Sequence, residues 1–90
     1  MHAAFRALAD PTRRAILEQL RDGPLTSGEI AQRFTITWAT VSRHLGVLTS
    51  AGLVLAERAG QNVRYELNGA VFQQIAHHLL SWTRQGSSHA

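Results

Sequence analysis

Cysteine and lysine are absent from this chain of 90 residues, and proline occurs only twice. Without cysteine the chain cannot form disulfides, thiolate zinc sites or thiol nucleophiles. No apolar run approaches the roughly 18 residues that a membrane span needs, and the N-terminus lacks the shape of a signal peptide. We therefore expect a cytoplasmic protein without membrane contact. An apolar content of 44% and a charged content of 17% predict a globular domain rather than a disordered tail.

The basic residues are all arginines, nine in number, and the formal net charge is +3. Acidic residues are missing between Ile30 and Ala56, a stretch that contains Arg33, Arg43 and His44. Arginine keeps its charge and forks onto phosphates and guanine edges, so this acid-free stretch favours a polyanionic partner such as nucleic acid. The alternative is that the arginines serve only to keep the protein soluble.

Helix signals divide the first half of the chain into four segments. Residues 2–9 have helical apolar spacing, and Asp10 followed by proline predicts the cap and start of a second helix. Thr26 and Glu29 form a capping box at the start of a third, short helix. Thr37 is expected to cap a fourth helix that runs to about Ser50. Its core positions, spaced i, i+4 and i+7, are Val41, Leu45 and Leu48.

The second half changes to a period of two before returning to helical spacing. Gly52 closes the fourth helix, and residues 53–58 and 63–67 read as two strands joined by a turn at 59–62. A last helix is expected from about Asn68 to Arg84. The order α-α-α-α-β-β-α predicts a mostly α winged helix-turn-helix fold with a small β-hairpin. The single domain would cover 1–85, with the helix-turn-helix at 26–50, the wing at 53–67 and a flexible tail at 86–90.

Five strings also resemble a known family: ALADPTRRAIL at 7–17, LTSGEIAQRF at 25–34, VSRHLGVL at 41–48, AGLV at 51–54 and VRYEL at 63–67. Together they resemble the ArsR-type (ArsR/SmtB) winged helix-turn-helix repressors of bacteria. The resemblance implies a homodimer that binds double-stranded DNA at a palindromic operator, usually near its own gene, and blocks transcription. Many members of that family release DNA when they bind a metal ion or another effector.

The resemblance also implies that the first and last helices form the dimer interface. The expected interface residues are Phe5, Leu8, Phe72, Ile75, Leu79 and Trp82. The sequence supports this independently, because Ala76 and Leu80 make the apolar stripe of the last helix broader than one small domain can cover. The alternative is that the last helix folds back onto its own core.

The resemblance assigns the DNA contacts position by position. In the family, bases are read at the positions of Trp38, Ala39, Ser42 and Arg43, and phosphates run near those of Thr37 and Thr40. The fork of Arg43 fits guanine, although a solvated surface arginine is the alternative. Trp38 departs from the family, which often has glutamine there. Its ring could touch a thymine methyl, stack along the groove wall or fold inwards towards Val41.

The wing supplies three further candidate DNA contacts, Arg58, Gln61 and Arg64, which flank or form its tip and could reach a minor groove or phosphates. On the second helix, Arg13 and Arg14 are either phosphate contacts or exposed side chains, and we favour exposure. His44 is expected to be a partly buried, hydrogen-bonded group rather than a base reader.

No cofactor or metal is expected. The thiolate site of some relatives needs cysteines in the third helix, which this chain lacks, and adjacent His77 and His78 point about 100° apart on a helix. A metal-responsive repressor with an inter-subunit histidine site remains an alternative, as does a winged-helix module that docks proteins. Ser42 and His44 have no orienting carboxylate, so no enzymatic activity is expected. The sequence does not identify an effector.

Overall fold

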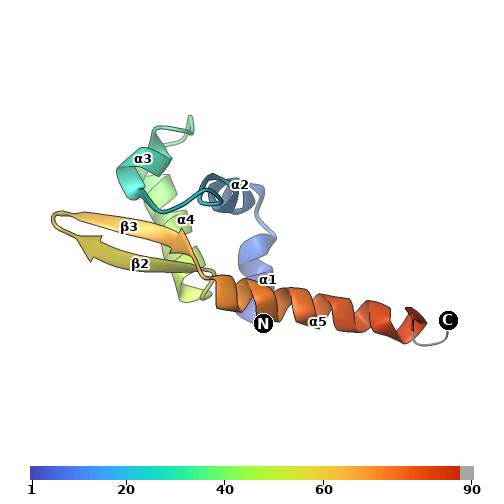
Figure 1. Cartoon of the computed structure of the whole chain (residues 1–90). Coiled ribbons are helices and arrows are strands. Elements are labelled where there is room, and N and C mark those ends of the chain that lie inside the picture. The colour runs from blue at the N-terminus through green and yellow to red at the C-terminus, as the bar shows by residue number, and fades with distance from the viewer. Residues whose placement is uncertain (88–90) are drawn as a thin grey trace.

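The computed structural model describes the backbone of residues 1–87 and the side chains of residues 1–83. Within that part, the chain forms a small helical body with a wing at one end and a long helix at the other (Figure 1). The elements in chain order are α1 (His2–Leu8), α2 (Pro11–Gln19), β1 (Leu25–Thr26), α3 (Ser27–Ala31), α4 (Trp38–Ser50), β2 (Val54–Ala59), β3 (Asn62–Leu67) and α5 (Gly69–Ser87). The predicted winged helix-turn-helix arrangement is confirmed.

The predicted caps fix the starts of α2 and α3. The carboxylate of Asp10 accepts a hydrogen bond of 2.9 Å from the backbone N–H of Arg13, and that bond holds the pKa of Asp10 below its ordinary value. At α3 the capping box is complete, because Thr26 N–H donates to Glu29 Oε1 at 2.8 Å and Glu29 N–H donates to Thr26 Oγ1 at 3.2 Å. Short helices therefore start at positions that the sequence defines.

The hydrophobic core lies where α2, α3, α4 and the base of the wing meet. Its largest fully buried side chains are Ile16, Leu20, Ile30, Leu45, Leu48, Leu53, Val41 and Val54. The predicted stripe of α4 belongs to it, since Val41, Leu45 and Leu48 are each 0% exposed. The two turns of α4 from Val41 to Leu48 are thus anchored by one face, which fixes the rotation of the helix and leaves its other face outward.

The sheet contains one strand that the sequence did not predict. The two-residue strand β1 pairs antiparallel with β3, Leu25 opposite Tyr65, so the strand order is β1-β3-β2. Two residues are too short to show a period of two, and one of them is also the cap of α3. The turn of the wing is tighter than predicted, because only Gly60 and Gln61 lie between the strands. Gly60 has a φ of +65°, which a two-residue hairpin turn requires at its first position.

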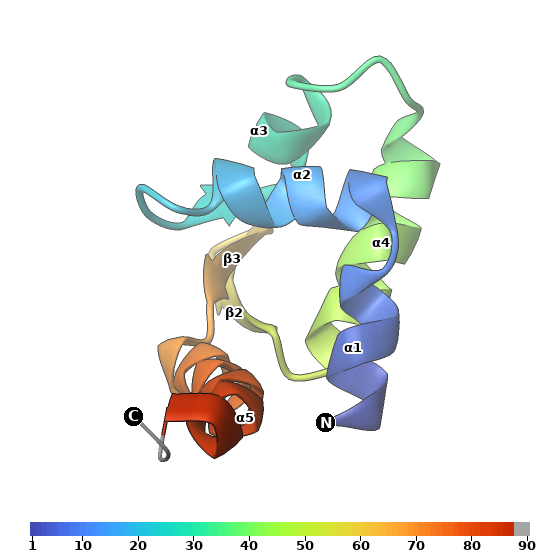
Figure 2. The ribbon, with the colours of Figure 1, turned by 90° about the vertical axis from the view of Figure 1, so that its right-hand side faces the viewer.

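Helix α5 leaves the body in the direction opposite to the wing (Figure 1), and it points towards the viewer when the molecule is seen from that end (Figure 2). Its first turns cover the core, with Ile75 only 5% exposed. Further along, Leu79 is 40%, Leu80 61% and Trp82 61% exposed. The helix runs to Ser87, so residues 86 and 87, the first two of the tail predicted at 86–90, are helical. One glycine costs a helix only about 1 kcal/mol, which is too little to stop a long one. Residues 88–90 lie outside the described residues.

Candidate nucleic-acid interface

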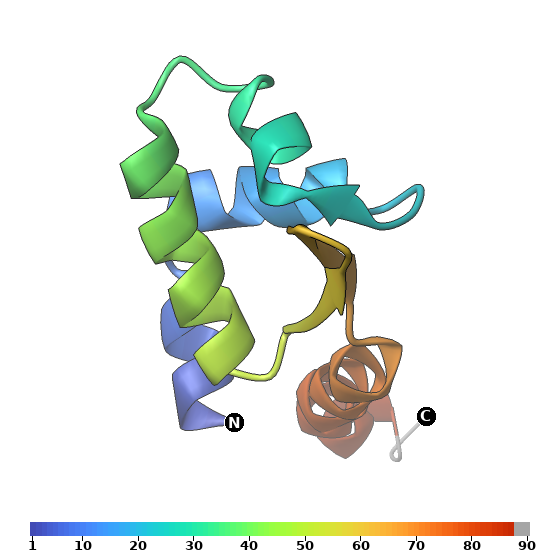
Figure 3. The same ribbon diagram turned by 90° about the vertical axis from the view of Figure 1, so that its left-hand side faces the viewer.

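The outward face of α4 carries the predicted base-reading residues. Trp38 is 58% exposed, and Ala39, Ser42 and Arg43 are also exposed. Ala39 and Arg43 lie opposite the buried stripe, Ser42 lies on the flank, and Trp38 lies one turn before Val41 at the exposed end of the helix. The ring of Trp38 therefore does not fold inwards towards the core. Viewed from the wing, α4 and the tip of the hairpin both lie on the near side of the molecule, while α5 recedes (Figure 3). One approaching surface can meet both elements.

Threonines organise the N-terminal end of α4. Thr37 Oγ1 accepts a hydrogen bond of 3.2 Å from the Thr40 N–H, and the two hydroxyl oxygens lie 2.9 Å apart. Thr37 is exposed and Thr40 half-buried. The cap confirms the predicted start of α4, and it places an exposed hydroxyl at the positive end of the helix dipole, where a phosphate is favoured. Whether either threonine contacts DNA stays a prediction.

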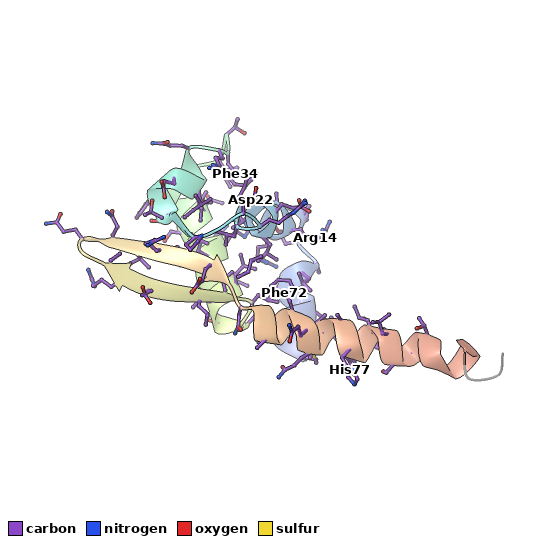
Figure 4. All side chains as sticks on the ribbon, in the orientation of Figure 1. Arg14, Asp22, Phe34, Phe72 and His77 are labelled. Carbon is purple, nitrogen blue, oxygen red and sulfur yellow. The ribbon has the colours of Figure 1, made fainter. Side chains whose placement is uncertain are left out.

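The connection before α4 is held in place by contacts with the rest of the chain. Phe34 and Ile36 are half-buried against the core, and Arg33 Nη1 donates a 2.8 Å hydrogen bond to Gln19 Oε1 of α2. Figure 4 shows Phe34 in the connection that follows α3. Arg33, which contributes to the acid-free stretch, is thus bonded to its own chain. The positive charge on the outward face of α4 comes mainly from Arg43.

The wing places its two arginines on opposite faces of the sheet. Arg64 lies directly across from Glu57 in the β2–β3 register, and Glu66 is two residues further along the same face. All three line one small hollow of about 180 Å³. Arg58 lies opposite Val63, on the other face, and is exposed together with Gln61 at the tip. The sequence missed this difference because the cross-strand neighbours depend on the register, which was not known.

The expectation that Arg13 is exposed was wrong. It is half-buried; its Nε donates to the Ala7 carbonyl at 2.8 Å and its Nη2 to the Arg6 carbonyl at 3.3 Å. Its Nη1 lies 3.4 Å from Nδ1 of His44, which is half-buried as predicted. Arg13 therefore caps the C-terminal end of α1, whose free carbonyls favour a cation. No pattern in the sequence pointed to this partner set.

Arg14 repeats this capping on the exposed side. Its Nη1 donates a 2.8 Å hydrogen bond to the Leu8 carbonyl, and the residue itself is exposed, as predicted. The adjacent pair of arginines therefore ties α2 to α1. The side chain of Arg14 lies near the junction of the two helices (Figure 4).

Helices α1 and α5, the predicted dimer helices, touch each other through aromatic rings. The rings of Phe5 and His78 are 6.0 Å apart, and those of His78 and Trp82 are 5.3 Å apart, edge to face. Phe5 and Leu8 are half-buried and pack against the core. Ile75 is buried within its own chain. For the first turns of α5 this agrees with the alternative that the last helix folds back onto its own core.

The remaining predicted residues of α5 divide into two groups. Phe72 lies at the start of the helix and packs against the core, whereas His77 is exposed and points away from the body (Figure 4). Among the described residues, no three or more His, Cys, Asp or Glu side chains gather where they could hold a metal ion. No described helix is long and apolar enough to cross a membrane.

These features define a winged helix-turn-helix protein, a class in which the second helix of the helix-turn-helix enters the major groove of DNA. The helix-turn-helix domain family matches residues 8–58 of the chain. The transcriptional repressor SdpR of Bacillus subtilis is 38% identical over 88 residues, which cover 98% of each of the two chains.

Solved structures agree with this relationship. The crystal structure of the ArsR family transcriptional regulator RHA00566 has a TM-score of 0.88 at 28% identity, over 96% of this chain and 94% of that one. The solution structure of the homodimeric winged helix-turn-helix DNA-binding domain of Mb0332 from Mycobacterium bovis has a TM-score of 0.76 at 29% identity, over 91% of this chain and 77% of that one. The chain belongs to the ArsR/SmtB family of winged helix-turn-helix repressors and is a DNA-binding transcriptional regulator.

Proposed function

We propose that the chain acts as a homodimeric repressor of its own gene, binding a palindromic operator upstream of that gene in the cytoplasm, with no enzymatic activity. The observation that carries the proposal is the exposed surface of α4, which has no acidic residue and includes Trp38 at the N-terminal end of the helix and Arg43 further along it. A recognition helix enters the major groove with its N-terminal residues at the base edges. In a homodimer two such helices would read half-sites about 34–36 Å apart.

Within each half-site the residues have separate roles. Arg43 is proposed to donate to O6 and N7 of a guanine. Trp38 is proposed to cover a thymine methyl, because its exposed ring lies at the N-terminal end of α4, five residues before Arg43, and has no amide with which to read adenine. Ala39 and Ser42 leave room for close approach to the base edges. Thr37 and Thr40 lie at the helix end and are assigned to phosphates.

The wing is proposed to contact the backbone beside the half-site through Arg58 and Gln61. Arg58 projects from the face of the sheet opposite to the glutamates, and Gln61 is exposed in the turn. Arg64 is the weaker candidate, because Glu57 and Glu66 on its own face offset its charge.

Dimerisation is proposed through the outer part of α5 together with α1. Leu79, Leu80 and Trp82 leave an apolar strip exposed on a projecting helix, and large exposed apolar patches are typical of protein contacts. Phe5, Leu8 and the exposed edge of Phe72 would lie at the inner border of this strip. The homodimeric state of the related Mb0332 domain supports this assignment.

Light scattering and footprinting test the proposal together. The wild-type chain should elute at twice its 9.9 kDa mass, and a variant with Leu80→Ser and Trp82→Ser should elute as the monomer. Leu55→Ser is the matched control, because Leu55 is 48% exposed on the wing and outside the proposed interface.

DNase I footprinting of the region upstream of the gene should show one protected, two-fold symmetric site for the wild type and the control. The monomeric variant should protect it only at much higher concentration. A monomeric wild type would refute the dimer assignment. The absence of any protected site, with the dimer intact, would refute autoregulation and favour a protein-docking role for the same face of α4.

A further inference from the structure

A groove of about 860 Å³ lies between α1 and the C-terminal half of α4. Helix α1 lies in front of the C-terminal end of α4 in Figure 2 and behind it in Figure 3, and the two helices contact each other. Its apolar surface includes Ala3, Gly46 and Val47, and the guanidinium-bearing residues beside them are Arg6, Arg13 and Arg43. The groove belongs neither to the aromatic contact between α1 and α5 nor to the wing.

The apolar part of the groove is open because of the residues that α4 presents there. A Cβ atom at Gly46 would meet no other atom within 4 Å, and Val47 is 39% exposed. From Arg43 to the C-cap residue Ala51 the groove follows α4 for eight residue steps, about 12 Å of rise. That volume and length suit a small molecule with an apolar body, since ligand sites occupy about 300–1,000 Å³.

The arginines at the rim of the groove indicate the chemistry of the polar end of the ligand. None of the lining residues is acidic. Within the described residues no hydrogen bond engages the guanidinium of Arg6 or of Arg43, whereas Arg13 is bonded to the carbonyls of α1. Two guanidiniums without a partner beside an apolar surface favour a carboxylate joined to an apolar chain, because charge-assisted bonds to carboxylates are strong and bidentate.

We propose that this groove binds an amphiphilic carboxylate and that occupancy weakens DNA binding. The second half of the statement rests on the proposed function of Arg43. The same guanidinium lines the groove and heads the base-reading face, so a bond to the bound carboxylate removes it from guanine. Ligand and DNA would then oppose each other through one shared side chain, and linkage requires each to weaken the other equally.

Nuclear magnetic resonance tests the binding site without DNA. Uniformly ¹⁵N-labelled protein is titrated with decanoate below its micelle concentration, and with decanol as the uncharged control. Saturable shifts should gather at the amides of Ala3, Gly46 and Val47. Decanol should bind about tenfold more weakly, the cost of one charge-assisted contact. Arg6→Gln should weaken decanoate to a similar extent, while Arg21→Gln on α2 should leave it unchanged.

Three results of this titration would overturn the site. They are the absence of saturable shifts, shifts confined to α5, and equal affinity for decanol and decanoate. The last would identify a non-specific apolar surface. A fourth result would contradict the proposed charge recognition: an affinity of Arg6→Gln for decanoate equal to that of the wild type.

Fluorescence anisotropy then tests the coupling. Decanoate at a concentration that just fills the wild-type groove should raise the Kd of the wild type for its upstream duplex at least fivefold. The same concentration should raise the Kd of Arg6→Gln less, because that variant binds decanoate more weakly and Arg6 is not placed in the DNA interface. Saturation of the groove without any change in Kd would refute the coupling. If the wild type bound no duplex specifically, the proposed function would fail, and the titration without DNA would still decide the ligand site.

Discussion

The two arginines of the wing provide a matched pair of substitutions. Arg58→Gln removes an exposed guanidinium on the face away from the acidic residues, and Arg64→Gln removes one that lies across from Glu57 and beside Glu66. Each substitution removes one positive charge and keeps a polar side chain of similar length. The two variants differ in the neighbours of the lost charge, so their comparison isolates the effect of the glutamates.

The expected magnitude follows from counterion release. A lost phosphate contact lowers the slope of log K against log salt by about 0.9, which amounts to about eightfold in affinity at 0.1 M salt relative to 1 M. A homodimer has two wings, so Arg58→Gln should reduce the slope by about 1.8 and weaken binding about 60-fold. Arg64→Gln should change binding less than about twofold, since its charge is already offset locally.

Anisotropy titrations of an operator duplex over a salt series measure both quantities. Glu57→Gln is a third variant, and it should tighten binding, because it leaves Arg64 without its cross-strand partner. Equal losses for Arg58→Gln and Arg64→Gln would refute the reasoning from the register. An unchanged salt slope for Arg58→Gln would show that the wing does not contact phosphates.

Three other expected outcomes concern folding stability. Leu45→Ala should lower the free energy of unfolding by about 2–5 kcal/mol in urea denaturation, because Leu45 is 0% exposed and its removal leaves a cavity; a loss below about 1 kcal/mol would contradict this packing. Thr37→Ala should cost about 1 kcal/mol as a lost cap in the same assay, and no loss would show that α4 does not need it. The N–H of Thr26 lowers the pKa of Glu29 from 4.5, so this bond stabilises the fold above about pH 4.5 and is lost as the pH falls through the lowered value. Acid denaturation should therefore be less steep in Glu29→Gln, and an identical profile would contradict the capping box.

Local chemistry made the helix boundaries predictable from the sequence. Asp10, Thr26 and Thr37 act as caps where the sequence placed them, because capping depends on residues within one turn of each other. Gly52, with a φ of +81°, follows the end of α4 for the same local reason. The buried stripe of α4 was equally predictable from the sequence, since its period is set by the helix itself.

Features that depend on distant segments were not predictable. The pairing of β1 with β3, the position of Glu57 across from Arg64 and the bonds from Arg13 to α1 each require the relative placement of separate elements. Whether the Trp38 ring faces the core or the solvent could not be predicted for the same reason, because its exposure depends on which surfaces the rest of the chain covers. The direction in which α5 leaves the body could not be inferred from its apolar stripe alone.

The most direct test of DNA recognition by α4 is the affinity of three proteins for the upstream duplex and for a scrambled duplex at about 0.15 M salt. The proteins are the wild type, Arg43→Gln and the charge-matched control Arg21→Gln. The wild type and the control should prefer the upstream duplex by at least about 1,000-fold. Arg43→Gln should lose about 1–3 kcal/mol of that preference per half-site. Full preference in Arg43→Gln, or no preference in the wild type, would contradict the assignment of α4 as the base-reading helix.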